Sequence, residues 1–280
     1  MIKEKALFPG CLVTYRFPEY ELSSKRVLEA LRIETHTLPE LMCCGQVLQG
    51  INPNWIYMTA YNLALAEQRD MDVITLCGGC TNTFKRVQSM CRQNPWVLDD
   101  INQVLTRVGL HFHNTVKTQH LLEVLYEHID KSMGCLRKVI PLKIAIMNPC
   151  QVFRPAAIMK FDNSKHPQVM ETLLGPVVSD IISYSLQDNC CGASLSMSDQ
   201  AAAYQVGKAR LEELEDKDVD LIITACGNCH LLLHCMQPEY YSGRRIPCLF
   251  LPQLLGLAMG FRPQDLMIND PRIRRMVTSV

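Results

Sequence analysis

Short apolar runs recur along the chain, and four of them are each followed within three residues by a cysteine. Runs of four or five mainly apolar residues that end at turn-forming residues are typical of buried strands. The four runs are Lys5 to Phe8, Val73 to Leu76, Lys143 to Met147 and Leu221 to Ala225. We therefore expect four strands whose carboxyl ends each carry a cysteine motif.

Helical stretches lie between these runs, and the clearest are Asn54 to Arg69 and Asp199 to Asp216. Strands that alternate with helices favour parallel sheets joined by right-handed crossovers. In such α/β folds, ligands bind at the carboxyl ends of the strands. The sequence therefore predicts an α/β protein whose cysteine motifs gather where ligands bind.

The second of these helical stretches has a defined apolar face and a defined start. Ala202, Val206 and Ala209 follow the i, i+4, i+7 spacing of one helix face. Either Ser198 or Asp199 can cap the first turn with a side-chain oxygen. We expect the three small residues to face the core.

Ten of the fourteen cysteines form a single five-cysteine pattern that occurs twice. Each copy has one lone cysteine, then Cys-Cys-Gly, then Cys-x-x-Cys. Because the pattern repeats, we expect two homologous domains related by a pseudo-twofold axis, residues 1–136 and 137–280. The charged, glycine-containing stretch Asp130 to Lys138 marks the boundary. The first copy comprises Cys11, Cys43, Cys44, Cys77 and Cys80, and the second comprises Cys150, Cys190, Cys191, Cys226 and Cys229.

Five thiols are more than one tetrahedral ion can use, since zinc takes four ligands. Adjacent residues in an extended segment point to opposite sides, so vicinal cysteines suit a larger soft-metal cluster with several irons. Glycines beside the thiols permit positive φ and a close approach of backbone N–H groups to the cofactor. These candidate cofactor-binding glycines are Gly45, Gly78, Gly79, Gly192 and Gly227.

Composition and charge narrow the function class. The formal net charge is zero, which gives no electrostatic reason to expect nucleic acid as a partner. The first residues lack the apolar core of a secretory signal, and the most apolar window, Cys248 to Phe261, is too short to span a membrane. We expect a cytoplasmic protein, where many cysteines indicate metal ligands rather than disulfides.

The doubled pattern resembles the B subunit of heterodisulfide reductase, and the resemblance covers nearly the whole chain. In that family each half is a cysteine-rich CCG domain whose five cysteines hold a noncubane [4Fe-4S] cluster. The resemblance implies one cluster on each of the two five-cysteine sets given above. It also implies an oxidoreductase that acts on a disulfide, such as the coenzyme M–coenzyme B heterodisulfide of methanogenesis.

The family resemblance also implies a mechanism and partners. A disulfide bound between the two clusters would be split, with one sulfur captured by an iron of each cluster. The chain has no ferredoxin-type cysteine run and no dinucleotide fingerprint. Its electrons are therefore expected from a ferredoxin-like C subunit and from a flavin-containing A subunit. Because sulfur-oxidising and hydroxyacid-oxidising systems share the domain, a role purely in electron transfer within such a complex is the alternative.

Other functions for these residues stay open at this point. Structural zinc at the two Cys-x-x-Cys motifs leaves six patterned thiols unexplained, and a thioredoxin-like dithiol at Cys77 and Cys80 leaves the repeat unexplained. His230, directly after Cys229, is a candidate proton donor. Two alternatives apply to the side chains of Lys85, Arg86 and Arg154: they bind anionic groups of a substrate, or they are solvated charges on the surface. The unpatterned cysteines, expected to be small buried residues, are Cys91, Cys135, Cys235 and Cys248.

Overall fold

The computed structural model describes residues 3–278. Within this range, eight strands form two four-stranded sheets, and every pair of neighbouring strands is parallel. The strand order is β2-β1-β3-β4 in the first sheet and β6-β5-β7-β8 in the second. The same order in both halves confirms the predicted duplicated α/β class. The strands are β1 (Lys5–Phe8), β2 (Thr35–His36), β3 (Asp72–Thr75), β4 (Thr118–His120), β5 (Ile140–Met147), β6 (Val178–Ile181), β7 (Leu221–Thr224) and β8 (Cys248–Phe250).

The four predicted strands are the central strands β1, β3, β5 and β7. Their bounds differ from the predicted ones by one residue or less, apart from β5, which begins at Ile140. The four outer strands are two to four residues long. Unlike the central strands, most of them contain polar or exposed residues and form no continuous apolar run, so the sequence did not predict them.

Helices follow each strand and cover the sheets. In the first half they are α1 (Cys11–Arg16), α2 (Pro18–Ala30), η1 (Gln46–Leu48), α3 (Trp55–Gln68), α4 (Gly78–Gln93), α5 (Pro95–Leu105), η2 (Thr106–Val108), α6 (Leu121–Glu127) and α7 (Ile129–Gly134). In the second half they are α8 (Cys150–Phe153), α9 (Ala156–Met159), α10 (Val169–Leu174), η3 (Ala193–Met197), α11 (Gln200–Asp216), α12 (Gly227–His230), the π-helix η4 (Leu231–Cys235), α13 (Gln237–Tyr240), α14 (Leu251–Ala258), η5 (Pro263–Leu266) and α15 (Pro271–Thr278).

Helices α3 and α11 confirm the two predicted helical stretches. The Asp199 side chain accepts a hydrogen bond from Ala202 N at 2.9 Å, as a capping residue does. The predicted apolar face of α11 is wrong by one position, because Ala202 and Val206 are only half-buried and Ala209 is exposed. The buried face consists of Ala203, Gly207, Arg210, Leu211 and Leu214.

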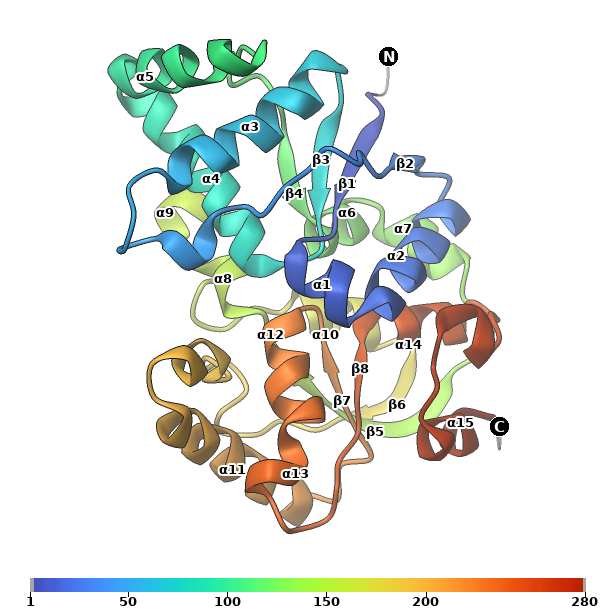
Figure 1. Cartoon of the computed structure of the whole chain (residues 1–280). Helices are drawn as coiled ribbons and strands as arrows, with labels where there is room; N and C mark the ends of the chain where they lie inside the picture. Colours follow the sequence, from blue (N-terminus) through green and yellow to red (C-terminus); the bar gives the residue numbers. More distant parts are fainter. Residues whose placement is uncertain (1–2, 279–280) are drawn as a thin grey trace.

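The two halves lie one above the other, with helices α1, α8 and α12 between them (Figure 1). The largest cluster of buried apolar side chains draws on both halves, while a smaller cluster belongs to each half alone. The halves therefore share a core. The two sheets lie on either side of the predicted domain boundary at 136/137, which itself stays a prediction.

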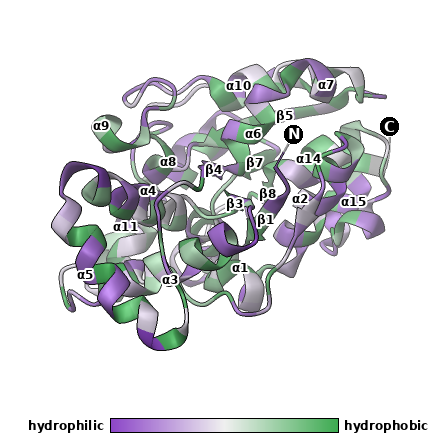
Figure 2. Ribbon diagram, turned by 90° about the horizontal axis from the view of Figure 1, so that it is seen from above, coloured by the Kyte–Doolittle hydropathy of each residue, from purple (hydrophilic) through white to green (hydrophobic). Residues whose placement is uncertain are grey.

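Hydropathy follows the expected layers. In Figure 2 hydrophobic and hydrophilic residues alternate along the outer helices, such as α5. Helix α5 buries Ile101 and Leu105 and leaves Trp96 largely exposed. Each such helix covers the core with one face and meets water with the other.

Candidate metal centres

The first five patterned cysteines come together at the carboxyl end of the first sheet. Cys11 begins α1 just after β1, and Cys77 is the N-cap of α4 just after β3. The Cys44 thiol is within hydrogen-bonding reach of Cys43 and Cys80, and Cys80 is within reach of Cys77. Cys11 is close enough to raise the pKa of Cys43, although the hydrogen bond to Cys44 contributes most to that shift. We call these five side chains the first thiol group.

The second set forms an unbroken chain of contacts at the carboxyl end of the second sheet. Cys190 links Cys150 to Cys191, and Cys229 links Cys191 to Cys226. Cys150 begins α8 after β5, and Cys226 is the N-cap of α12 after β7. These five side chains form the second thiol group. The structure thus brings together both sets that the sequence pattern defines.

Each thiol group contains a strongly acidic member. Hydrogen bonds from Cys43 and Cys80 lower the pKa of Cys44 to about 4. Hydrogen bonds from Cys150 and Cys191 lower the pKa of Cys190 to about 2. Because neighbouring thiolates repel one another, the proton stays on the donors, and the pKa of Cys150 is raised by its hydrogen bond to Cys190. Such a crowded set of sulfur ligands suits a soft metal centre with several ions.

The glycines after the two vicinal pairs have the predicted positive φ, and their part in cofactor binding stays a prediction. Gly45 and Gly192 have φ of 83° and 92°. Their N–H groups point at the Sγ atoms of Cys43 and Cys190, each at 3.5 Å. A side chain at Gly45 would place its Cβ 2.8 Å from the carbonyl oxygen of Trp55. Only glycine fits this turn.

The glycines inside the Cys-x-x-Cys turns lack the predicted positive φ, and their part in cofactor binding stays a prediction. Gly78, Gly79 and Gly227 do not have positive φ, because they begin helices α4 and α12. A Cβ on Gly78 would lie 3.1 Å from Val152 Cγ2, and one on Gly227 would lie 3.2 Å from Leu12 Cδ2. Each turn therefore packs against the segment that follows the lone cysteine of the other half. This reciprocal packing is the observed form of the pseudo-twofold relationship.

Residues of the first half also form part of the second site. A narrow cavity of about 30 Å³ is lined by Gln46, Gly78 and Gly79 of the first half and by all five cysteines of the second thiol group. Gln151, Ser194 and Asn228 add polar groups to its lining. Gln46 Nε2 donates to Gln151 Oε1 at 2.9 Å across the two halves. Sequence reasoning missed these amides, although each lies within two residues of a motif cysteine.

A further residue missed from the sequence is Gly10, which has a φ of 84°. A Cβ at this position would lie 3.0 Å from Cys80 Sγ. The glycine lets the backbone before Cys11 run close to the sulfur of the Cys-x-x-Cys motif. Its position directly before a motif cysteine could have identified Gly10 from the sequence.

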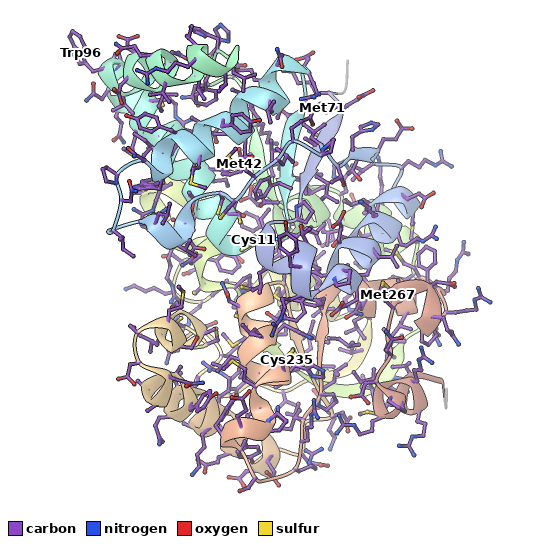
Figure 3. The ribbon with its side chains drawn as sticks, in the orientation of Figure 1. Cys11, Met42, Met71, Trp96, Cys235 and Met267 are labelled. Carbon is purple, nitrogen blue, oxygen red and sulfur yellow. The ribbon has the colours of Figure 1, made fainter. Side chains whose placement is uncertain are left out.

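The unpatterned cysteines agree with the prediction in part. Cys91 and Cys248 are buried, and Cys135 is half-buried with its thiol 3.7 Å from Ala30 O. Cys235 is exposed, which corrects the expectation that all four are buried. It ends the π-helix η4, where the turn is wider and the side chain faces outward. Figure 3 labels it together with the exposed Cys11 of the other half.

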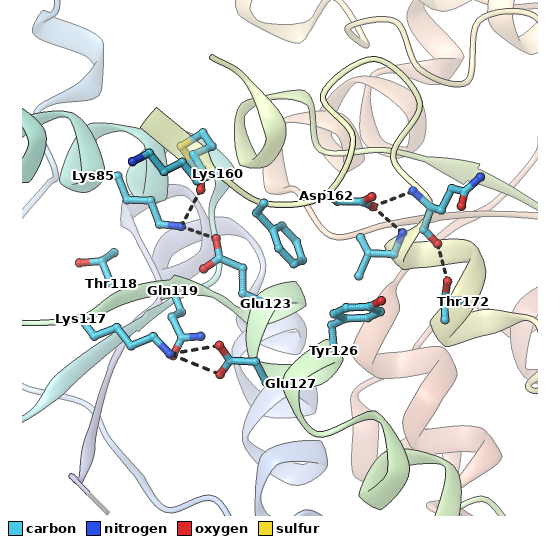
Figure 4. A pocket seen from close by; sticks show the side chains of 14 residues that line it. Lys85, Lys117, Thr118, Gln119, Glu123, Tyr126, Glu127, Lys160, Asp162 and Thr172 are labelled. Carbon is cyan, nitrogen blue, oxygen red and sulfur yellow. Dashed lines mark hydrogen bonds and ion pairs between the residues drawn. The ribbon is translucent and has the colours of Figure 1, made fainter. Parts of the chain in front are cut away.

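The three cations proposed from the sequence as substrate contacts or solvated charges are bound within the protein. Lys85 forms a buried ion pair with Glu123. Arg86 Nε donates to Asn82 Oδ1 at 2.7 Å, and Arg154 donates to two backbone carbonyls. Figure 4 shows Lys85 directed toward Glu123 in a cavity of about 440 Å³ whose lining includes no cysteine. These contacts hold all three side chains half-buried against the protein, and a role of these cations in substrate binding stays a prediction.

His230 lies in an aromatic stack behind the second thiol group. Its ring stacks on Phe250, with centroids 4.2 Å apart, and meets the edge of Phe17 at 5.0 Å. Burial lowers the pKa of His230 well below its ordinary value, so the ring is neutral. The stack gives His230 a packing role, and its role as a proton donor stays a prediction.

Two kinds of feature are absent from the described residues. No group of three or more His, Cys, Asp or Glu side chains among residues 3–278 has an arrangement that could hold one metal ion. In the same range, no helix combines the length and the apolar character needed to cross a membrane.

Known proteins are similar to this chain in sequence or in fold. The B subunit of the ferredoxin/F(420)H(2)-dependent CoB-CoM heterodisulfide reductase of Methanosarcina acetivorans is 26% identical, over 97% of this chain and 94% of that protein. The 8-methylmenaquinol:fumarate reductase membrane anchor subunit of Wolinella succinogenes is 27% identical, over 96% of each chain. The crystal structure of a hypothetical protein from Helicobacter pylori has the same fold, with a TM-score of 0.77 and 19% identity. It matches 96% of this chain, which spans about half (52%) of that longer one.

The family assignment rests on the duplicated pattern itself. The cysteine-rich domain family CCG matches residues 5–85 and again residues 144–234. Each match begins at or within a central strand and ends beyond the Cys-x-x-Cys motif. The chain therefore belongs to the cysteine-rich CCG domain family and carries the domain twice, as its repeated cysteines predict.

Proposed function

We propose that each thiol group holds one iron-sulfur cluster, and that this chain is the component of a reductase complex on which a disulfide is reduced. The observation that carries the proposal is the gathering of ten patterned thiols into two contacting groups, one at the carboxyl end of each sheet. Thiolate-only sets are the usual ligands of iron-sulfur clusters. The relatives named as components of reductases support the same class.

The residues around the thiols fit such a cofactor. The N–H groups of Gly45 and Gly192 face the Sγ atoms of Cys43 and Cys190, as donors to ligand sulfurs do in these centres. Gly10 leaves space at Cys80 Sγ that a side chain would fill. All ten patterned cysteines are free thiols and none is in a disulfide.

The cluster type that we propose is the noncubane [4Fe-4S] form implied by the resemblance to the B subunit of heterodisulfide reductase. When bound, the two clusters supply electrons one at a time to the sulfurs of a substrate disulfide. The chain itself supplies the ligands and the contact between the halves. The amides of Gln46, Gln151 and Asn228 line the cavity at the second group and are placed to bind polar groups of a substrate.

For substrate and partners we propose a small disulfide, such as the heterodisulfide of coenzymes M and B, and electron-donating protein chains. The donors are a ferredoxin-like C subunit and a flavin-containing A subunit, in a cytoplasmic complex. Support comes from the relative in Methanosarcina acetivorans, which is named as one component of a CoB-CoM heterodisulfide reductase.

A second candidate function is electron transfer without a substrate of its own. The Wolinella succinogenes relative favours it, because that protein is named as the membrane anchor subunit of a fumarate reductase. In such a complex, the cluster-bearing chain would pass electrons between a donor and a separate catalytic chain. The two candidates differ in whether the isolated chain reduces a disulfide.

The proposal is tested by metal content and by the effect of single cysteines. Anaerobically prepared protein should contain about eight irons and about eight acid-labile sulfides per chain, four of each per cluster. C44S and C191S replace a soft thiolate by a hard, poorly ionised hydroxyl. Each variant should therefore lose about half of its iron and about half of its acid-labile sulfide. C135S, outside the repeat, is the matched control and should lose neither. Two zinc ions per chain without sulfide would exclude the clusters.

A further inference from the structure

A buried arginine supports the loop that carries the vicinal pair of the second thiol group. Arg210, on α11, has no exposed surface. Its Nη2 donates to the carbonyl oxygens of Leu186 at 3.0 Å, Asn189 at 3.4 Å and Cys190 at 3.3 Å. Its Nε and Nη1 have no hydrogen-bond partner among the described residues. The guanidinium therefore holds the loop in place while two of its nitrogens are left unsatisfied.

The groups around Arg210 do not neutralise its charge. The hydroxyls of Tyr184 and Tyr240 are its neighbours, and burial raises the pKa of both, so they are neutral. The Glu213 carboxylate accepts hydrogen bonds from Ser185 instead, at 2.6 and 2.8 Å. Asp188 is bound to Asn148 and His166. Within residues 3–278, no carboxylate lies within ion-pair distance of Arg210.

A buried cation without an anionic partner costs several kcal/mol, because it loses its hydration. Glu213 interacts with Arg210 only from beyond ion-pair distance, whereas Cys190 lies on the loop to which Arg210 donates. Arg210 Nη2 donates to the carbonyl oxygen of Cys190 itself, so the cation lies directly beside the second thiol group. The arginine and the second thiol group are therefore electrostatic partners.

The first thiol group has a neutral residue in the corresponding place. Asn62, on α3, is also fully buried, and its Nδ2 donates to the carbonyl oxygens of Met42, Cys43 and Met58. Its Oδ1 accepts from Met42 N at 2.8 Å. Asn62 and Arg210 thus both donate to the carbonyl of the first cysteine of a vicinal pair. They differ in that only Arg210 brings a charge.

We propose that Arg210 is a positioning residue that gives the second cluster a higher reduction potential than the first. This inference rests on the proposed function, since it needs a redox centre in each thiol group. A reduced cluster carries one more negative charge than the oxidised cluster, and a buried cation stabilises that form. An electron that enters the chain then resides mainly at the second site.

Redox titration of the full-length, anaerobically loaded chain tests this assignment. C44S leaves only the second cluster, and C191S leaves only the first, so each potential is measured by itself against a chemical reductant. R210Q keeps amide donors for the loop but removes the charge, and R210K keeps the charge with fewer donors. In the C44S background, R210Q should shift the one-electron equilibrium at least tenfold toward the oxidised form, about 59 mV. R210K should retain most of the wild-type potential, and R210Q in the C191S background should leave the first cluster unchanged.

If R210Q leaves the reduction potential of the second cluster unchanged, the inference is overturned. It is also overturned if R210K shifts this potential as much as R210Q does, because loop geometry and not charge would then be the cause. If R210Q does not load iron, the effect of charge is tested at the first cluster with N62D. This substitution keeps the shape of the side chain and places a negative charge beside that cluster. N62D should lower the potential of the first cluster by a similar factor, and R210K must still load iron. Failure of either expectation overturns the charge effect. Absence of iron and sulfide from the wild-type chain would instead contradict the proposed function.

Discussion

The hydroxyl of Tyr20 donates a hydrogen bond to the carbonyl oxygen of Ala225 at 3.0 Å, across 205 residues of sequence. Tyr20 is fully buried on α2 in the first half, and Ala225 directly precedes Cys226 in the second. The ring of Tyr20 also stacks on Phe250, with centroids 4.2 Å apart. One side chain of the first half therefore fixes the backbone that leads into a cysteine motif of the second.

Removing this hydroxyl should destabilise the contact between the halves. Y20F keeps the ring stack but leaves the buried Ala225 carbonyl without its donor, which costs about 1–3 kcal/mol. Urea unfolding, followed by circular dichroism, should show a lower midpoint for Y20F. Y15F is the matched control, because Tyr15 is 83% exposed on the neighbouring helix α1. Equal midpoints for the two variants would mean that the hydrogen bond contributes nothing.

The reciprocal glycine contacts give a second prediction. G78A adds a methyl group 3.1 Å from Val152 Cγ2, and G227A adds one 3.2 Å from Leu12 Cδ2. Overpacking of this kind costs about 1–3 kcal/mol, so both variants should unfold at lower urea concentration. G134A should not, since a Cβ at Gly134 has no atom within 4 Å and its φ is not positive. Helix propensity favours alanine over glycine, so a destabilisation of G134A as large as that of G78A would show that contact between the halves does not set these values.

The sequence predicts the central strands, two helices and both thiol groups, because each depends on a local pattern. The buried face of α11 was misplaced for a physical reason. Arg210 is charged, and charged residues rarely lie fully buried without a partner. The pattern therefore assigns it to the surface, and the predicted face shifts by one residue. The hydrogen-bond partners of Arg210 are carbonyl oxygens of a loop about 20 residues earlier, which periodicity within one helix cannot reveal.

The cavity amides and the reciprocal glycines could not be predicted for a related reason. Gln46 meets Gln151, and Gly78 meets Val152, only because the two halves pack against each other. A repeat indicates that two domains have the same fold but does not determine which surfaces are in contact. Similarly, the ion pair of Lys85 with Glu123 joins residues 38 positions apart, which no local pattern reveals.

Buried histidine should make the fold acid-sensitive. Burial, together with the charge of Lys85, lowers the pKa of His120 to about 3. Below the ordinary pKa of about 6.5 the unfolded chain binds a proton that folded His120 does not, so stability falls as the pH drops toward 3. One such group contributes up to about 1.4 kcal/mol per pH unit. The unfolding midpoint should fall less between pH 7 and pH 5 in H120N than in the wild type. If the midpoint falls equally in both, groups other than His120 cause the pH dependence.

The last prediction concerns whether the two thiol groups act as one site. In a shared site each half takes part in cleaving one disulfide, and groups that act as a unit are strongly non-additive. C80S and C229S should each remove nearly all disulfide reduction, measured with reduced viologen as a soluble donor, and the double variant should be no worse than either. C135S is the control and should keep its rate. In a chain that only transfers electrons, damage to the group farther from the donor would leave the nearer one reducible and partly active with artificial acceptors. Substantial disulfide reduction in either single variant would therefore assign this chain to electron transfer.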